Sequence, residues 1–309
     1  MAGPLLLFFG KNMNTENKNS LLLSRNEWAL VGITIIWGLT FIMVRNVLVA
    51  TGPLFFVGFR FGIATLILAV VSIRVIPKIT REEVIAGSLI GFTLFLGYAL
   101  QTYGMQFISA SKSGFITAFY VPTVPVVQWL LMRKRPPLMA WLGIAFAFAG
   151  LVLLAGPDGV SGGFGKGEIA TIIGALVMGF EIVFISLFAG KISVRRVCIV
   201  QVLVTSLCAF VAMPIAGEPI PSFSWLLVLS ALALGAISAL VQFVMNWAQK
   251  TVSPTRATII YSGEPVWAGV FGRIAGERLP AIALVGGLLV VIGVLVSGLR
   301  NTKKNEGQS

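Results

Sequence analysis

The sequence is a succession of long apolar stretches separated by short polar connections. Ten stretches are long enough to cross a bilayer as helices, near residues 28–49, 54–76, 84–108, 113–132, 138–155, 169–189, 195–215, 224–249, 257–275 and 281–299. The stretches are continuously apolar, whereas the strands of a membrane β-barrel alternate apolar and polar positions. We therefore expect an all-α membrane protein with ten transmembrane helices and no separate soluble domain.

Composition agrees with this pattern and removes several classes of chemistry. The 309 residues are 57% hydrophobic and only 11% charged, with a mean hydropathy of +0.95. The chain has no histidine, and its only aspartate is Asp158, in a predicted loop. The two cysteines, Cys198 and Cys208, lie in one apolar stretch without a CxxC spacing and read as packing residues. We therefore expect no metal site, no cofactor and no histidine-based catalytic triad.

The positive charges are distributed unevenly between the two sides that ten spans define. Of the 23 Lys and Arg residues, 17 fall on the side of the N-terminus, five fall on the other side, and Arg60 lies inside a span. Because basic residues accumulate in cytoplasmic loops, both termini are expected in the cytoplasm. We expect a multi-pass protein of a cell membrane, the inner membrane of a bacterium, whose charges serve the lipid bilayer and not a nucleic acid.

An internal repeat relates residues 103–155 to residues 246–298 at a constant offset of 143. Identical pairs include Gln106/Gln249, Pro122/Pro265, Val127/Val270, Arg135/Arg278, Pro137/Pro280, Gly143/Gly286 and Gly150/Gly293. Five spans is an odd number, so two five-span repeats enter the membrane from opposite sides and are inverted.

This organisation predicts five segments. They are a cytoplasmic tail at 1–27, a first five-helix repeat at 28–155, an external loop at 156–167, a second repeat at 168–300 and a cytoplasmic tail at 301–309.

Three charged residues, Arg60, Glu181 and Glu264, lie well inside predicted spans. A charged side chain at the bilayer centre costs about 2.5–3.5 kcal/mol on insertion scales, so such residues face a bundle interior or a watery cavity. These residues either handle substrate or ions or form a buried ion pair. The two glutamates have a third alternative, which is to stay uncharged as protonated carboxyl groups. Gly58 and Gly62 flank Arg60 on the opposite helix face, which indicates that Arg60 points to a cavity if the glycines pack on a neighbour.

Prolines interrupt two of the apolar stretches at positions that the repeat relates. Pro122, Pro125 and Pro265 lack an N–H group, so each is expected to free the carbonyl four residues before it, that of Ala118, Val121 and Tyr261 respectively. Free carbonyls at membrane depth are tolerated where they line a cavity. We expect these prolines to act as hinges, the alternative being static kinks that only shape packing.

Other polar and aromatic residues share helix faces with these groups, Tyr98 with Gln101, Gln242 with Asn246, and Tyr261 with Glu264. The predicted substrate-binding residues are Trp37, Arg60, Tyr98, Gln101, Tyr120, Gln242, Asn246, Tyr261 and Glu264. The alternative is that the aromatic residues belong to the core or to interfacial belts.

Two glycine patterns carry no chemistry. The glycine-rich segment 159–168 lacks the glycine at 160 and the Ser or Thr at 167 that a phosphate-binding loop needs, so ATP hydrolysis is not encoded there. Small-residue stripes in the fifth and tenth stretches read as a scaffold or as a dimer surface, so a monomer and a homodimer both remain possible.

The sequence resembles the drug/metabolite transporter superfamily, and within it the EamA-like ten-span transporters. The resemblance covers about residues 28 to 300. The segments that carry it are WGLTFIMVR (37–45), FRFGIATLIL (59–68), YGMQFISASKSGFITAFYVPTVPVV (103–127) and EPVWAGVFGRIAGERL (264–279). One departure is clear: the second half has GER at 276–278, whereas the first half has RKR at 133–135, which weakens a role for a glutamate at that end of the first repeat.

The resemblance implies a secondary transporter that exports small metabolites, such as amino acids or related compounds, by alternating access, or takes up similar solutes. Proton coupling through Glu264 or Glu181 and uncoupled facilitation both remain open. A membrane-embedded enzyme acting on lipid-linked substrates is the main alternative, and a channel or sensory protein is a third. The scarcity of Asp and the absence of His argue against the enzyme.

Overall fold

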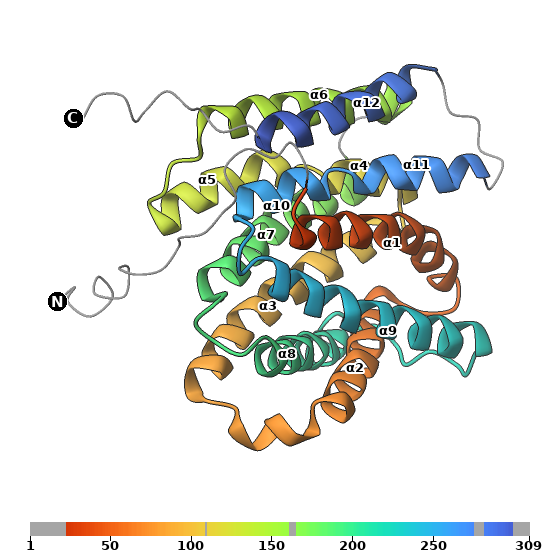
Figure 1. Ribbon diagram of the computed structural model, residues 1–309. Coiled ribbons are helices and arrows are strands. Elements are labelled where there is room, and N and C mark those ends of the chain that lie inside the picture. The colour runs from red at the N-terminus through yellow and green to blue at the C-terminus, as the bar shows by residue number, and fades with distance from the viewer. Residues whose placement is uncertain (1–22, 109, 161–164, 275–280, 299–309) are drawn as a thin grey trace, which may run out of the picture.

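The computed structural model describes residues 23–108, 110–160, 165–274 and 281–298, and these residues form helices without a single strand. Figure 1 shows the arrangement, in which α6 and α12 lie side by side along one edge and α2, α3, α8 and α9 form the opposite part. The helices are α1 (Arg25–Val47), α2 (Pro53–Val71), the 3-10 helix η2 (Ile73–Lys78), α3 (Arg81–Gly104), α4 (Ala110–Thr117), α5 (Tyr120–Met132), α6 (Leu138–Val160), α7 (Lys166–Phe188), α8 (Val194–Ile215), α9 (Trp225–Ala248), α10 (Pro254–Tyr261), α11 (Glu264–Ile274) and α12 (Ala281–Gly298).

The all-helical membrane class is confirmed. Seven segments of the described chain are long and apolar enough to cross a membrane, and one of them, Lys112–Met132, joins α4 to α5. Two further apolar stretches, Leu138–Leu153 in α6 and Val285–Ser297 in α12, are shorter. The chain is therefore a multi-pass membrane protein. The count of ten spans and their inverted order stay predictions.

Polar residues next to the apolar stretches define where several helices begin. Ser24 and Glu27 form a capping box at the start of α1, and Thr80 and Glu83 form another at the start of α3. In each box the hydroxyl and the carboxylate accept hydrogen bonds from backbone N–H groups that the helix leaves unpaired. The apolar stretch that follows then supplies the surface that packs or faces lipid.

Two predicted spans are broken into pairs of short helices. The stretch predicted at 113–132 contains α4 and α5, and the stretch predicted at 257–275 contains α10 and α11. The breaks follow Thr117 and Tyr261, and the offset of 143 relates them to within one residue. The prolines thus accompany a two-residue turn within each stretch, and Lys112–Met132 remains one apolar segment long enough to cross a membrane.

The prolines lie just after these breaks. Pro122 is the third residue of α5 and Pro265 is the second residue of α11, positions whose N–H groups have no partner within the helix in any case. Pro125 lies further inside α5. The expectation of a free carbonyl at Ala118 is wrong, because that carbonyl accepts a hydrogen bond from the N–H of Val121 at 2.9 Å.

Glycines allow α6 and α12 to approach each other closely. A β-carbon on Gly143 would lie 2.7 Å from the carbonyl oxygen of Gly293, and one on Gly150 would lie 2.5 Å from that of Gly286. The predicted small-residue stripes therefore meet each other within one chain. The glycine face of this seam is filled by the chain itself and does not form an exposed dimer surface, and the oligomeric state stays a prediction.

Helix α2 separates its small face from its charged residue. The Cβ position of Gly58 contacts the ring of Phe210 on α8, that of Gly62 contacts Ser206 on α8, and Ser206 Oγ donates a hydrogen bond to the carbonyl of Gly58 at 2.8 Å. Arg60 lies two residues from each glycine and points away from α8 into the bundle. The spacing argument for the orientation of Arg60 is therefore confirmed.

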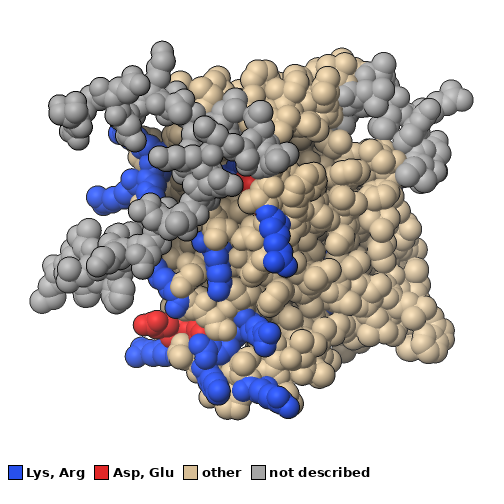
Figure 2. Space-filling model, viewed as in Figure 1, with Lys and Arg blue, Asp and Glu red and all other residues tan. Residues whose placement is uncertain are grey.

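Basic residues gather on one face of the molecule (Figure 2). They lie at helix ends and in the short connections between helices, and the exposed ones are Arg25, Arg74, Lys78, Arg81, Arg133, Lys134, Arg135, Lys191, Arg195 and Lys250. Below, "the basic end" means the end of the bundle that carries these residues, and "the far end" means the opposite one. The basic end is the one that the charge rule predicts to be cytoplasmic.

Candidate functional site

A small cavity of about 50 Å³ lies inside the bundle between the two broken segments. Its walls come from α1, α2, α3, α7 and α9 and from the residues next to the two breaks. The lining residues are Trp37, Thr40, Phe41, Val44, Arg60, Tyr98, Gln101, Met105, Thr117, Tyr120, Met178, Glu181, Ile182, Gln242, Met245, Tyr261 and Glu264. In this conformation the cavity is smaller than typical small-molecule sites.

Arg60 supplies the cationic side of the cavity. It is buried on α2, its Nε donates a hydrogen bond to Ser238 Oγ on α9 at 2.6 Å, and its guanidinium carbon lies 5.1 Å from the ring centre of Tyr98. In the described part of the chain, Arg60 forms no ion pair with a carboxylate. The alternative that Arg60 neutralises Glu181 or Glu264 as a structural ion pair is therefore wrong for this conformation.

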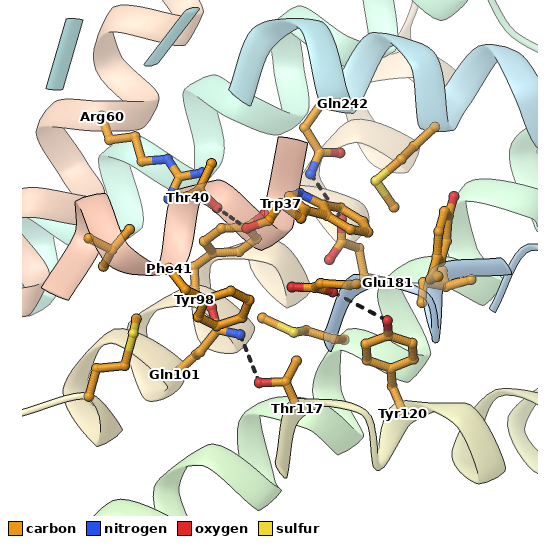
Figure 3. Close-up of a pocket in the computed structure, with 17 residues that line it drawn as sticks. Trp37, Thr40, Phe41, Arg60, Tyr98, Gln101, Thr117, Tyr120, Glu181 and Gln242 are labelled. Carbon is orange, nitrogen blue, oxygen red and sulfur yellow. Dashed lines mark hydrogen bonds between the residues drawn. The ribbon is translucent and has the colours of Figure 1, made fainter. Parts of the chain in front are cut away.

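Of the two buried carboxylates, Glu181 lies across the cavity from Arg60 (Figure 3), and Glu264 lines the same cavity. Glu181 Oε1 on α7 accepts a hydrogen bond from Gln242 Nε2 on α9 at 3.3 Å. Glu264 is the first residue of α11, and its Oε2 accepts a long hydrogen bond of 3.5 Å from the hydroxyl of Tyr120 at the other break. Neither carboxylate pairs with a cation of the described residues, so both can receive a positive group that enters the cavity.

Aromatic side chains form the wall next to Glu264. The rings of Trp37 and Tyr261 meet edge to face, with centroids 5.2 Å apart. The hydroxyl of Tyr261 accepts a hydrogen bond from Gln249 Nε2 at 3.1 Å, and Gln249 Oε1 accepts one from Ser186 Oγ at 2.7 Å. These bonds fix the Tyr261 ring, so the cavity has a rigid aromatic surface beside its carboxylates.

Eight of the nine residues predicted to bind substrate line the cavity, and Glu181, predicted for coupling, lines it as well. Asn246 does not. It is buried behind the cavity wall, where its Nδ2 donates to Gln201 Oε1 at 3.1 Å and to the backbone oxygen of Gln242 at 2.9 Å. The expectation that Asn246 contacts substrate is wrong in this conformation, since shared face on a helix does not decide how deep a side chain lies. That the other eight bind substrate stays a prediction.

Sequence reasoning missed part of the lining. The missed residues are Thr40, Phe41, Val44, Met105, Thr117, Met178, Ile182 and Met245. Most are apolar, and nothing in a membrane sequence distinguishes an apolar residue facing a cavity from one facing lipid. Thr117 had one available signal, because it stands next to the proline-marked break; its Oγ1 accepts a hydrogen bond from Gln101 Nε2 at 2.8 Å.

Comparisons with known proteins agree on the class of the molecule. The model of the EamA-like transporter family matches residues 26–156 and again residues 165–299. An "Uncharacterized transporter" of Archaeoglobus fulgidus is 29% identical over 279 residues, which cover 89% of this chain and 86% of the relative. The "Uncharacterized inner membrane transporter YedA" of Escherichia coli K12 is 30% identical over 280 residues, covering 87% of this chain and 89% of the relative.

A solved crystal structure has the same fold. It aligns with a TM-score of 0.71 over 89% of this chain and 98% of its own, at 17% sequence identity. These names point to transport and not to an enzyme, and the family model covers nearly the whole chain in two successive segments. The chain belongs to the EamA-like transporter family.

Proposed function

We propose that this transporter moves small metabolites, amino acids or related compounds, by alternating access, in the direction of export. The observation that carries the proposal is the cavity, because both family-matched segments contribute to its walls. Trp37, Arg60 and Tyr98 come from the first segment, and Glu181 and Glu264 come from the second. A site between two halves becomes accessible from either end when the halves move relative to each other.

The charges of the cavity favour a zwitterionic solute. Arg60 offers a guanidinium held by Ser238, the uncompensated carboxylate of Glu181 lies across the space from it, and the uncompensated carboxylate of Glu264 lines the same cavity. An α-amino acid carries a carboxylate and an ammonium group on one carbon. The carboxylate would bind Arg60, the ammonium group would bind the glutamates, and the side chain would lie against the aromatic wall of Trp37 and Tyr261.

The architecture that we propose is ten spans in two inverted five-helix repeats. Exchanging α1 to α6 with α7 to α12 leaves the main helix contacts of the described chain unchanged. The exchange replaces α3 by α9, and α3 contacts α7 and α8 just as α9 contacts α1 and α2. It also replaces α5 by α11, and α5 contacts α7 just as α11 contacts α1. Helices α6 and α12 replace each other and are in contact. The positions of the two breaks and the two matches of the family model support the same division.

Two ion pairs occupy corresponding places at opposite ends of the bundle. Glu27, the third residue of α1, accepts from Arg256, the third residue of α10, at 2.6 Å. Glu168, the third residue of α7, lies 2.7 Å from Lys112, the third residue of α4. We propose that these pairs are gates, one for the basic end and one for the far end, and that each opens in turn.

The basic end carries the additional hydrogen bonds. Gln128 Oε1 on α5 accepts from the N–H and the hydroxyl of Thr255 on α10, and Asn26 Nδ2 on α1 donates to Thr251 Oγ1. Arg256 also donates to Ser297 and to the carbonyl of Val294 on α12. Among the described residues, these bonds add to the ion pair that closes the basic end.

The breaks supply the place for movement, and Glu264 supplies the coupling group. Glu264 and Pro265 begin α11, directly after the break, so a change in the angle between α10 and α11 alters the access of water to the carboxylate. In this proposal Glu264 takes up a proton or the substrate ammonium group in one state and releases it in the other, Glu181 is the second acidic group, and Pro122, Pro125 and Pro265 are the hinge residues. Facilitated transport follows if neither glutamate exchanges a proton.

Transport by purified protein in liposomes tests the proposal. The panel comprises radiolabelled amino acids, nucleosides and organic cations, each with and without a pH gradient. Saturable flux of an amino acid that shows counterflow is the expected result, and its dependence on the gradient separates coupled from facilitated transport. Flux without saturation would mean a channel and chemical conversion would mean an enzyme; either would overturn alternating access.

A further inference from the structure

Three buried amides form a chain that ends on Glu181. Asn246 Nδ2 on α9 donates to Gln201 Oε1 on α8 at 3.1 Å, and Gln201 Nε2 donates to Gln242 Oε1 on α9 at 2.8 Å. Gln242 Nε2 then donates to Glu181 Oε1 at 3.3 Å, the link drawn in Figure 3. Gln201 and Asn246 are buried and lie outside the cavity, so nothing in the proposed substrate contacts explains them.

The direction of the chain is fixed at Asn246. Its Nδ2 group also donates to the backbone oxygen of Gln242 at 2.9 Å, and a backbone oxygen only accepts. Turning the Asn246 amide over would place its oxygen against that carbonyl and against Gln201 Oε1. Gln201 and Gln242 therefore each accept a hydrogen bond from the previous amide at the oxygen and offer an NH2 group to the next acceptor.

This order prevents Gln242 from presenting its oxygen to Glu181. Such a turn would leave the Nε2 group of Gln201 without an acceptor in a fully buried place, and a buried unpaired donor is costly. Glu181 is consequently held by a neutral donor. Arg60 bonds Ser238 on α9, so it does not compensate the carboxylate. Among the described residues, the second oxygen of Glu181 has no hydrogen-bond partner and is left for the cavity that Glu181 lines.

We propose that Gln201 and Asn246 are positioning residues that act through Gln242. They keep one oxygen of Glu181 on the amide and the other oxygen available to the cavity. The meaning of this arrangement for transport rests on the proposed function, but the positioning itself does not. The other titratable or charged side chains that line the cavity with Glu181 are Arg60, Tyr98, Tyr120, Tyr261 and Glu264.

Reaction with dicyclohexylcarbodiimide, an apolar reagent that modifies protonated carboxyl groups, tests the positioning. The full-length protein is treated in lipid nanodiscs, and the adducts on Glu181 and Glu264 are quantified separately by peptide mass spectrometry. Gln201→Met removes the donor to Gln242, so the Gln242 amide is free to turn and its NH2 group is no longer fixed on the ionised carboxylate. We expect Glu181 to react about three- to tenfold faster, the range given by the loss of one hydrogen bond, while Glu264 reacts at the wild-type rate.

Three further variants separate positioning from a general structural effect. Ser206→Ala is the matched control, because Ser206 is a buried polar residue on α8 that bonds the carbonyl of Gly58 outside the cavity, and it should leave the Glu181 rate unchanged. Asn246→Leu should accelerate the reaction of Glu181 less than Gln201→Met does. It replaces Gln201→Met as the test variant if Gln201→Met does not fold. In a Gln242→Met background, Gln201→Met should not change the reaction rate of Glu181 further, because the Gln242 amide that links Gln201 to Glu181 is already absent.

The proposal is overturned if Glu181 reacts at the wild-type rate in Gln201→Met and Asn246→Leu, or if Ser206→Ala accelerates it equally. It is also overturned if Gln201→Met keeps its effect in the Gln242→Met background. The reaction needs no transported solute. A protein that moves none of the solutes in the transport panel would still give a clear result, so failure of this proposal and failure of the proposed function are distinguishable.

Discussion

The carboxylate of Glu27 and the guanidinium of Arg256 join the first turn of α1 to the first turn of α10, with Oε1 and Nε 2.6 Å apart. The same two places at the far end hold Glu168 and Lys112. Both pairs are partly exposed, so each contributes at most ~1 kcal/mol. That is enough to shift a balanced equilibrium between two conformations, but not enough to hold the bundle together.

Glu27→Gln is expected to increase the exposure of the cavity at the basic end by about two- to fivefold, because up to ~1 kcal/mol of closure is lost. The reporter is a cysteine in place of Thr40, which lines the cavity, in a protein whose Cys198 and Cys208 are replaced by alanine. Labelling by a membrane-impermeant maleimide in vesicles of each orientation measures the exposure. Glu168→Gln should shift labelling to the opposite side, and a shift to the same side would contradict paired gates.

Arg60→Gln is expected to raise the KM for a transported amino acid by about tenfold or more. A hydrogen bond to a charged group contributes about 1.5–3 kcal/mol, and the substrate carboxylate would lose it. The yield of folded protein should stay near that of the wild type, because Arg60 has no carboxylate partner among the described residues to be left unpaired. Liposome flux and size-exclusion chromatography measure the two quantities.

The same residue offers a test of the ion-pair alternative. If Arg60 were a structural partner of a glutamate, Arg60→Leu would lower the yield and a second change, Glu181→Gln or Glu264→Gln, would restore it. We expect no such restoration. Arg60→Lys should retain part of the transport, since it keeps the charge but loses the planar stacking on Tyr98.

Glu264→Gln is expected to abolish accumulation driven by a pH gradient while sparing the exchange of substrate at equal concentrations. Glutamine keeps the size and the hydrogen bonding of the residue but cannot exchange a proton. Accumulation and exchange are measured with the same liposomes. Should the variant accumulate substrate normally, the acidic coupling group is Glu181, and Glu181→Gln should then show the loss.

Gly293→Ala is expected to lower the thermal unfolding temperature in detergent by a few degrees, because overpacking of this kind costs about 1–3 kcal/mol. The added methyl group would lie 2.6 Å from the carbonyl oxygen of Gly143. Gly32→Ala is the matched control within a helix, since no heavy atom lies within 4 Å of the added group. Equal unfolding temperatures for the two variants would show that α6 and α12 are not held at this distance.

Cysteine labelling in intact cells tests the orientation of the chain. Cysteines introduced at Lys78, Lys134 and Arg195 are expected to react only after the membrane is made permeable, whereas one at Lys166 should react in intact cells. The reason is the excess of basic residues at the end that carries the first three positions. Reaction of position 166 only in permeable cells would contradict the inverted repeat.

Much of the fold could be predicted from the sequence because lipid imposes simple requirements on a chain. Long apolar stretches, such as 169–189 and 224–249, form helices since no other arrangement pairs their backbone groups in a bilayer. The breaks were predicted only as kinks. A proline removes one hydrogen bond wherever it stands, but whether the helix continues depends on new partners, as when Val121 donates to the carbonyl of Ala118.

By itself, the sequence determined which residues of the candidate site carry charge at membrane depth and that Arg60 points away from the glycine face of α2. Burial of a charge is expensive wherever the chain folds, so Arg60, Glu181 and Glu264 stand out without any coordinates. Only the tertiary structure decided how they pair, because Ser238, Gln242 and Tyr120 lie 178, 61 and 144 positions away from them along the chain. The tertiary structure alone placed Asn246 behind the cavity wall and Thr117 on the wall. The reason is that the depth of a side chain depends on which neighbouring helices cover that side chain.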